Sequence, residues 1–378
     1  MGLTGSNAGP DQTTVNVARS NGDENAGTTT DNAEQEALMR DWGMMTRRQV
    51  AVRMGTLLLG AAALAGAGPA AAADKIKVAG IYTQPIQQKW DARLHQALDK
   101  AAKAGEIEYV FSEKVANTDY VRVLREYAEG GAKLIVGEAF GISREARKVA
   151  DDYPKVAFLM GDPFKPHGSN FAVFDNYIHE PCYLMGMIAG SMTKSNKIGM
   201  VGGYPIGEVN RLFHAFMAGA RSVNPKVEFK VNFIGSWYDP PKAKEAAFAQ
   251  VEAGVDVLYA ERAGVVSAAR EKGIIAFGNV NDMNKEENGT GVVVTSALWD
   301  MTSAINYAIA QTKAGTFKAE DYKEWTMMAK GGASLAPFYE FEDKISPDIK
   351  AKVKALQADI LAGKFTVEIN DNEPKSTF

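Results

Sequence analysis

The chain has 378 residues, 46% of them hydrophobic and 23% charged, with a formal net charge of −4. This composition is that of an ordinary soluble protein of about two domains, and it excludes fibrous and collagen-like structures. Lysine and arginine residues are dispersed along the chain, which leaves no basic surface for binding a nucleic acid.

The first 44 residues are rich in Asn, Thr, Gly, Asp and Glu and contain few large apolar side chains. Such a composition buries too little surface to fold, so residues 1–44 are predicted to be a disordered extension. Residues 45–73, which follow, resemble an export signal, and such a signal stands at the start of a chain. We therefore expect Met44 or Met45 to be the initiator, with the preceding residues a mis-assigned start or an appended tail.

Residues 45–73 have the three parts of an export signal. Arg47 and Arg48 precede an apolar run over 54–67, and a stretch of alanines ends at Ala73. The run is shorter than the roughly 20 residues that span a membrane, and the whole resembles a twin-arginine signal cleaved after Ala73. The alternative is an amphipathic helix inside a domain. No cysteine lies directly after the run, so the mature protein is expected in the periplasm without a membrane anchor.

From residue 74 onward, short apolar runs alternate with amphipathic stretches, a pattern typical of parallel sheets covered by helices. The first series predicts one doubly wound lobe over 74–178. Its strands are predicted over 77–82, 108–111, 134–137 and 156–160, and its helices over 90–104, 119–129 and 143–152.

A second series predicts a similar lobe over 179–295. Its helices are predicted over 181–192, 209–223, 241–253 and 265–272, and its strands over 197–201, 227–233, 255–259 and 274–277. A weaker pattern then predicts strands over 291–294 and 365–367 and helices over 300–313 and 346–361. We expect about 296–325 to complete the first lobe, about 326–367 to complete the second, and 368–378 to form a tail. The predicted fold is therefore α/β, with two Rossmann-like lobes.

Signatures of common enzymes are absent from the sequence. There is no G-x-S-x-G, H-E-x-x-H, P-loop or G-x-G-x-x-G motif. The four histidines have no metal-ligand spacing, and Cys182 lies on a predicted helix as a buried, inert thiol. We therefore expect a protein that is not an enzyme and holds neither metal nor cofactor.

Aromatic, amide and acidic side chains gather directly after the predicted strands. In open α/β sheets ligands bind beyond the carboxyl ends of the strands, so two facing lobes place one site in the cleft. Aromatic faces hold a flat heteroaromatic ligand, while amide groups pair with its edge. The alternative for each aromatic residue is an ordinary place in the core. The predicted binding residues are Tyr82, Gln84, Trp90, Glu138, Phe140, Trp237, Asp239, Glu261, Asn279, Asn281 and Trp299.

Several stretches, in their order and spacing, resemble the basic membrane protein family of purine-receptor-like, type I periplasmic binding proteins. The resemblance covers 75–367 and is best over 197–203, at Phe216 with Gly219, and over 235–240, 254–258 and 268–273. It implies two lobes joined by a hinge with three crossovers, closure around the ligand, a monomer, and delivery to an ABC permease and its ATPase. In the nucleoside branch, aromatics hold the base while a Gly, an Asp and a Lys hold the ribose.

This chain departs from the family pattern at several of these positions. Trp90 takes the place of the stacking aromatic, because the family's S-F-N becomes Lys89-Trp90-Asp91. In the other departures, residues of this chain stand where the family has a different motif. Thr83-Gln84-Pro85 replaces T-D-x-G, Glu261-Arg262 replaces Gly-Gly, and Thr295 to Trp299 replaces T-S-x-x-K. Arg144 and Glu145 lie near the position of the acidic residue expected after Gly-Phe, and Val280 stands where the carboxylate that binds the ribose is expected.

These replacements remove polar partners for a ribose and add bulk. A buried pocket that loses its hydroxyl partners rejects hydroxyl-bearing ligands, so we hypothesise that the ligand is a free purine base such as adenine. The alternatives are a purine nucleoside receptor of the same family, a ligand-sensing module without transport, and a nucleoside hydrolase that uses Asp239, Glu261 or Asp282.

Overall fold

The computed structural model describes residues 15–17 and 75–378. The predicted signal over 45–73, and the predicted extension over 1–44 apart from one strand, lie outside the described residues. That strand, β1 (Val15–Val17), pairs antiparallel with β3 (Ile107–Ser112), where the composition had predicted no regular structure. None of the helices in the described part of the chain is both long and apolar enough to cross a membrane.

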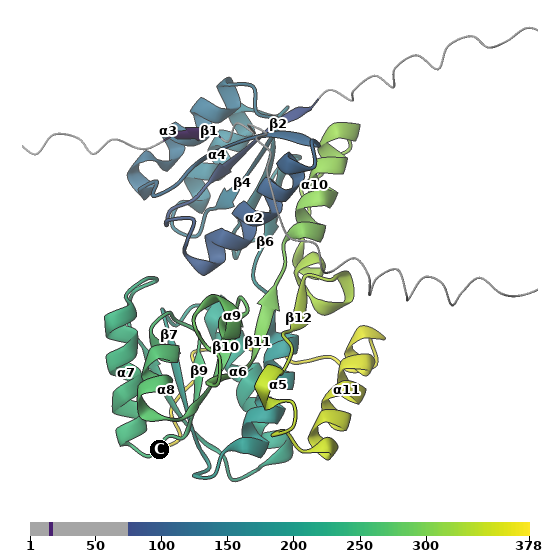
Figure 1. The fold of residues 1–378 in the computed structure, drawn as a ribbon. Helices are drawn as coiled ribbons and strands as arrows, with labels where there is room; N and C mark the ends of the chain where they lie inside the picture. The colour runs from purple at the N-terminus through teal and green to yellow at the C-terminus, as the bar shows by residue number, and fades with distance from the viewer. Residues whose placement is uncertain (1–14, 18–74) are drawn as a thin grey trace, which may run out of the picture. The chain divides into compact units, whose positions relative to one another are not determined.

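The first lobe is built on a sheet with the strand order β1-β3-β2-β4-β5-β6, parallel except for β1 (Figure 1). Its remaining strands are β2 (Ile76–Ile81), β4 (Leu134–Glu138), β5 (Ala157–Gly161) and β6 (Phe171–Phe174), and its helices are α2 (Lys89–Lys103), α3 (Asn117–Glu129) and α4 (Ser143–Asp152). The sequence predicted each of these elements except β6. That strand is a run of four buried residues with no helical pattern ahead of it to mark its beginning.

The second lobe is built on a sheet with the order β12-β11-β10-β9-β7-β8, antiparallel only between β11 and β12. Its strands are β7 (Lys197–Gly202), β8 (Glu228–Phe233), β9 (Val257–Ala260), β10 (Ile275–Val280), β11 (Val293–Trp299) and β12 (Ala333–Leu335). Its helices are α5 (His179–Met192), α6 (Gly207–Val223), α7 (Pro240–Glu252), α8 (Val265–Lys272), α9 (Met283–Glu286) and α11 (Pro347–Leu361). Short 3-10 turns η1 (Lys323–Thr326), η2 (Met328–Lys330) and η3 (Tyr339–Phe341) complete the described elements.

The chain passes between the lobes three times in the described residues, which confirms the predicted connectivity. It crosses after β6, crosses back after β11 so that α10 (Thr302–Ala314) lies against α2 and β4, and crosses again between η1 and η2 (Figure 1). β11 stays in the second sheet up to Trp299, a few residues past the point near 296 where the sequence placed the return to the first lobe.

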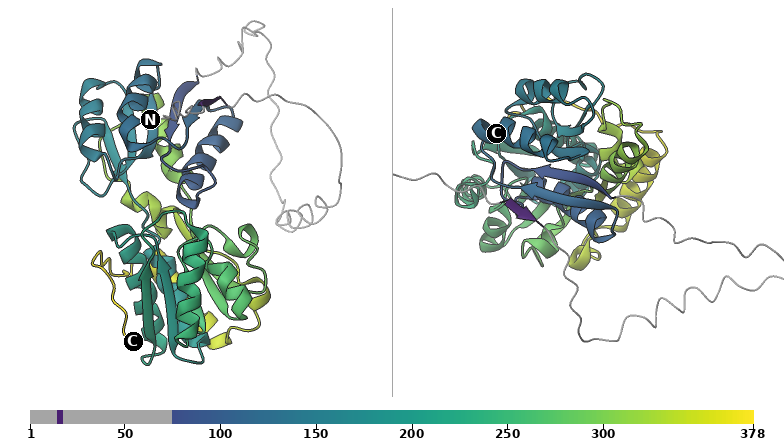
Figure 2. Two further views of the ribbon diagram at one scale, coloured as in Figure 1. Left: turned by 90° about the vertical axis from the view of Figure 1, so that its left-hand side faces the viewer. Right: turned by 90° about the horizontal axis from the view of Figure 1, so that it is seen from above.

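The predicted strand over 365–367 is wrong. The side chain of Val367 is buried in the core while the backbone of this segment pairs with no sheet. The chain instead continues along the outer edge of the second lobe (Figure 2), where Ser376 and Thr377 hydrogen-bond to β8. These contacts cover the edge of β8, which would otherwise offer free N–H and C=O groups.

Two helices at the centre of the second lobe approach each other closely because glycines lie at their contact. A Cβ on Gly219 of α6 would lie 1.9 Å from the carbonyl oxygen of Tyr183 on α5, and one on Gly186 would lie 2.1 Å from that of Phe216. No larger residue fits at this contact without moving a helix. The packing explains the Phe216 and Gly219 pair that the sequence singled out.

Candidate ligand-binding site

A cavity of about 450 Å³ lies where the loops at the carboxyl ends of both sheets meet. The first lobe contributes the loops after β2, β3 and β4 together with the start of α2, and the second contributes the loops after β7, β8 and β9. The lining residues are Thr83, Gln84, Gln88, Trp90, Asp91, Val115, Ala116, Asn117, Glu138, Phe140, Gly141, Ile142, Ile206, Glu208, Trp237 and Arg262. This is the position expected for a ligand in an open α/β sheet.

Five of the predicted binding residues line this cavity: Gln84, Trp90, Glu138, Phe140 and Trp237. They come from the loops after β2, β4 and β8 and from the first turn of α2. The start of α2 is fixed by Gln88, whose side-chain oxygen accepts hydrogen bonds from the backbone N–H groups of Trp90 and Asp91. This cap satisfies two of the unpaired donors at a helix start and presents residues 90 and 91 to the cavity.

Three other predicted residues are held in internal contacts away from the lining. Tyr82 is fully buried, with its hydroxyl 2.7 Å from that of Tyr109. The side-chain oxygen of Asn279 accepts a 2.8 Å hydrogen bond from the Tyr259 hydroxyl. The Asn281 amide donates to Glu286 at 3.1 Å.

The remaining three predicted residues also lie outside the lining. Asp239 caps α7 by accepting a hydrogen bond from the Lys242 N–H. Glu261 is buried and pairs with Arg262, and Trp299 is 1% exposed in the core. The sequence located the strand ends correctly, whereas the direction of each side chain depends on the local path of the backbone beyond the strand.

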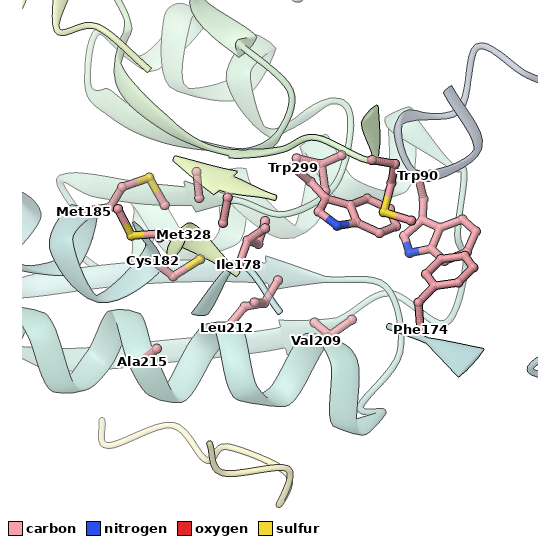
Figure 3. Packing of buried hydrophobic residues seen from close by; sticks show 14 of the residues in the cluster. Trp90, Phe174, Ile178, Cys182, Met185, Val209, Leu212, Ala215, Trp299 and Met328 are labelled. Atoms are coloured by element: carbon pink, nitrogen blue, oxygen red, sulfur yellow. The ribbon is translucent and has the colours of Figure 1, made fainter. Parts of the chain in front are cut away.

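Trp90 forms one side of the cavity and is at the same time part of an aromatic cluster. Its ring stacks on Phe174 with the centroids 5.6 Å apart, and the centroid of the Trp299 ring lies 5.2 Å away (Figure 3). Phe140 meets its edge at 5.8 Å. With 7% of its surface exposed, Trp90 supports the wall of the cavity more than it offers a free face.

Trp237 is more accessible than Trp90 and comes from the opposite lobe. Its ring lies 4.8 Å from that of Tyr204, and the guanidinium of Arg262 lies 5.2 Å from its centroid. The second lobe therefore contributes a partly exposed aromatic side chain, while Phe140 contributes another from the first lobe. Two such rings from facing lobes suit a flat ligand.

Three carboxyl groups line the cavity. Thr83 donates to Glu138 through its N–H at 3.0 Å and through its hydroxyl, yet burial raises the pKa of Glu138. Burial, followed by the charge of Glu138, raises the pKa of Asp91 well above its usual value, and Asp91 Oδ1 is buried without a hydrogen-bond partner. Burial, followed by the charge of Asp175, raises the pKa of Glu208 in the same direction.

The positive charges near these carboxyl groups already have partners. Arg262 binds Glu261 and donates to the Trp237 carbonyl oxygen at 2.6 Å. Lys89 forms an ion pair of 2.6 Å with Glu287. A ligand that presents an N–H donor would therefore find one unsatisfied carboxyl oxygen in the lining, Oδ1 of Asp91.

Val280 and Trp299, the two residues that the sequence aligned with ribose-binding positions of the family, are both buried. Val280, at the expected ribose carboxylate, is 3% exposed, and Trp299, at the end of the T-S-x-x-K equivalent, is 1% exposed. Neither lines the cavity. Both side chains belong to the hydrophobic core.

Sequence reasoning did not select Gln88, Asp91, Asn117 or Glu208, which all line the cavity. Asp91 and Gln88 flank residues that it had considered, and the first turn of a helix after a parallel strand is the signal that could have found them. Glu208 lies in the first turn of α6 after the β7 loop, a position equivalent to that of Asp91 in the other lobe.

Comparisons with known proteins identify the group to which this architecture belongs. Residues 75–355 match the Bmp family model, described as ABC transporter substrate-binding protein PnrA-like. A purine-binding protein of Brucella abortus is 32% identical over 300 residues, covering 76% of this chain and 83% of the relative. A putative ABC transporter glucose-binding protein of Haloferax volcanii is 32% identical over 308 residues, covering 80% and 76%.

A solved structure of an ABC transporter solute-binding protein from Aeropyrum pernix shares the fold. Its TM-score is 0.67 at 20% identity, and the match covers 78% of this chain and 94% of that one. This likeness confirms the predicted type I periplasmic-binding fold. The family match and the two relatives together confirm the resemblance: the chain belongs to the Bmp family of PnrA-like substrate-binding proteins of ABC transporters.

Proposed function

We propose that this protein captures a free purine base, such as adenine, between its two lobes and delivers it to an ABC importer. Members of its family are solute-binding proteins that work with a permease and an ATPase, and ABC solute-binding proteins typically act outside the cytoplasmic membrane. The names of the relatives differ in ligand, since one is a purine-binding protein and another a putative glucose-binding protein. The choice of ligand therefore depends on the cavity.

The observation that carries the purine proposal is the pairing of aromatic and carboxyl groups in one cavity. Phe140 and Trp237 come from opposite lobes, and the Asp91 carboxyl, whose Oδ1 has no hydrogen-bond partner, lies in the same lining. A protonated carboxyl presents a donor and an acceptor side by side, as an amide does, and this pair matches the donor and acceptor on an adenine edge. Its raised pKa favours the protonated form.

The buried Val280 and Trp299 favour a free base over a nucleoside. A ribose carries hydroxyl groups that need partners, and a site without those partners rejects a ligand that has them. Closure of the lobes on the base would exclude water from these contacts and shift the population toward the closed form.

Calorimetric titration of the purified protein tests the proposal. The ligands are adenine, guanine and hypoxanthine, their nucleosides, and glucose as the control that the haloarchaeal relative suggests. We expect a base to bind more tightly than its nucleoside, and glucose not to bind. Equal or tighter nucleoside binding would favour the nucleoside receptor, and binding of glucose alone would remove the purine proposal.

The enzyme alternative finds little support in the geometry of its three candidate residues. Asp239 caps α7, Glu261 is paired with Arg262, and Asp282 accepts a hydrogen bond from the Tyr339 hydroxyl. None of the three lines the described cavity. Release of hypoxanthine during overnight incubation with inosine would restore the hydrolase alternative.

Export through the twin-arginine signal, and a monomer without a membrane anchor, complete the proposal. The sequence of residues 45–73 is its basis. Replacement of Arg47 and Arg48 by lysine should keep the full-length chain in the cytoplasm of an expressing bacterium, while the parent is cleaved after Ala73. Detection of the cleaved form for both proteins in the periplasmic fraction would contradict a twin-arginine route.

A further inference from the structure

Two ion pairs connect the lobes beside the cavity. Lys89 Nζ lies 2.6 Å from Glu287 Oε1, and Arg93 Nη2 lies 3.0 Å from Glu286 Oε2. The two cations belong to α2 of the first lobe, and the two glutamates lie at the end of α9 in the second. These are therefore contacts that exist only while the lobes are close together.

The cations are placed to act together. Lys89 and Arg93 are four residues apart, so they lie on one face of α2. Lys89 also approaches the Met283 sulfur at 3.3 Å, and its side chain is 13% exposed. A pair with this degree of burial is screened less by salt than an exposed pair.

The acidic side of the contact is held in position by the second lobe itself. The Asn281 amide donates to Glu286 Oε2, the same oxygen that Arg93 binds. Asn281, which the sequence assigned to the ligand, thus orients one of the two glutamates. Its position after β10 serves the contact between lobes.

The same helix turn carries ligand-lining residues and lobe-joining residues. Gln88, Trp90 and Asp91 line the cavity, while Lys89 and Arg93 reach the other lobe. A ligand that fixes this turn also fixes the cations, and an ion pair that fixes the cations restrains the turn. Binding and closure are coupled when both favour the same state.

We propose that Lys89–Glu287 and Arg93–Glu286 form an interlobe latch that favours the closed arrangement and so increases ligand affinity. Attraction between the charges falls as the lobes separate and the distance between them grows. The latch consequently stabilises the closed state relative to the open one, which is the differential interaction that a population shift requires. The proposal applies whichever small molecule occupies the cavity.

Small-angle X-ray scattering of the ligand-free full chain tests the latch without a ligand. Arg93→Glu turns one attraction into a repulsion, and the exchange Arg93→Glu with Glu286→Arg restores it in reverse. Arg125→Glu is the matched control, because Arg125 pairs at 2.6 Å with Asp152 inside the first lobe. We expect a larger radius of gyration for Arg93→Glu alone, with the parent value for the exchange and for the control.

Salt provides a second measurement on the unmodified protein. Raising the ionic strength from about 0.05 M to about 1 M shortens the Debye length to about 3 Å. Glu286 is 45% exposed, so its pair with Arg93 should weaken and the parent should enlarge toward the Arg93→Glu value. If Arg93→Glu does not fold, as judged by circular dichroism, Glu286→Gln removes the same pair without a repulsion. An unchanged radius for the folded variant, or an exchange that stays enlarged, would overturn the latch.

Affinity supplies the functional measurement. With adenine as the probe, Arg93→Glu should weaken binding about threefold to tenfold, as expected when one ion pair is replaced by a repulsion, a change of roughly 0.7 to 1.4 kcal/mol. The exchange should recover the loss. If adenine fails to bind the parent as well, the purine proposal fails, while the scattering result still decides for or against the latch.

Discussion

Replacement of Trp237 by alanine is the sharpest test of how this cavity holds its ligand. Trp237 follows β8, lines the cavity and is only partly buried. Its known contacts are Tyr204 at 4.8 Å and the Arg262 guanidinium at 5.2 Å. If a purine base stacks on this ring, its loss should cost about 1 to 3 kcal/mol of binding, or roughly a fivefold to 150-fold weaker Kd.

The neighbouring Tyr238 is the matched control for this experiment. It is another large aromatic side chain of the same loop, but it is 55% exposed and does not line the cavity. Calorimetric titration with adenine should therefore show the parent Kd for Tyr238→Ala, and Trp237→Phe should retain part of the affinity. The stacking assignment would be refuted if Trp237→Ala bound adenine as tightly as the parent, or if Tyr238→Ala weakened binding to the same extent.

Two further predictions concern the start of α2. Trp90→Ala should lower the free energy of unfolding by about 3 to 5 kcal/mol, because the indole is 7% exposed and packs on Phe174. Urea unfolding followed by circular dichroism measures this change. An unchanged unfolding midpoint would show that the ring is not part of the core. Asp91→Asn should change how stability depends on pH. Burial raises the pKa of Asp91 well above its usual value, so the unfolded chain releases this proton near pH 4 while the folded chain keeps it. The free energy of unfolding of the parent should therefore fall as the pH rises above about 4, whereas that of the asparagine variant should not. Parallel curves of stability against pH for the two proteins over pH 4 to 8 would contradict the raised pKa of Asp91.

The location of the site at the strand ends could be predicted from the sequence, but only some of the residues that line it could be. Residues at the ends of parallel strands lie at one edge of a sheet whatever their side chains do, and this rule led to Gln84, Glu138 and Trp237. The rule does not say whether a side chain turns toward the cleft or into the core. Tyr82 and Trp299 turn into the core, where a large aromatic ring gains more from burial than from the cleft.

Two of the three carboxyl groups in the cavity were missed for a related reason. Asp91 and Glu208 lie in the first turns of helices rather than directly after strands, and a helix start is open to solvent in most proteins. In the folded protein both are buried enough that burial is the main cause of the raised pKa of each carboxyl group. No local pattern in the chain indicates that burial.

What the sequence by itself determined are the features that depend on local periodicity: the alternation of strands and helices, the two similar lobes, the missing enzyme motifs and the family. Each of these features depends on residues that are near one another in the chain. What only the tertiary structure decided are the contacts between residues far apart, such as Lys89 with Glu287 and Trp90 with Trp299. Their partners are chosen by how two separately folded sheets meet, and that meeting depends on the packing of both surfaces at once.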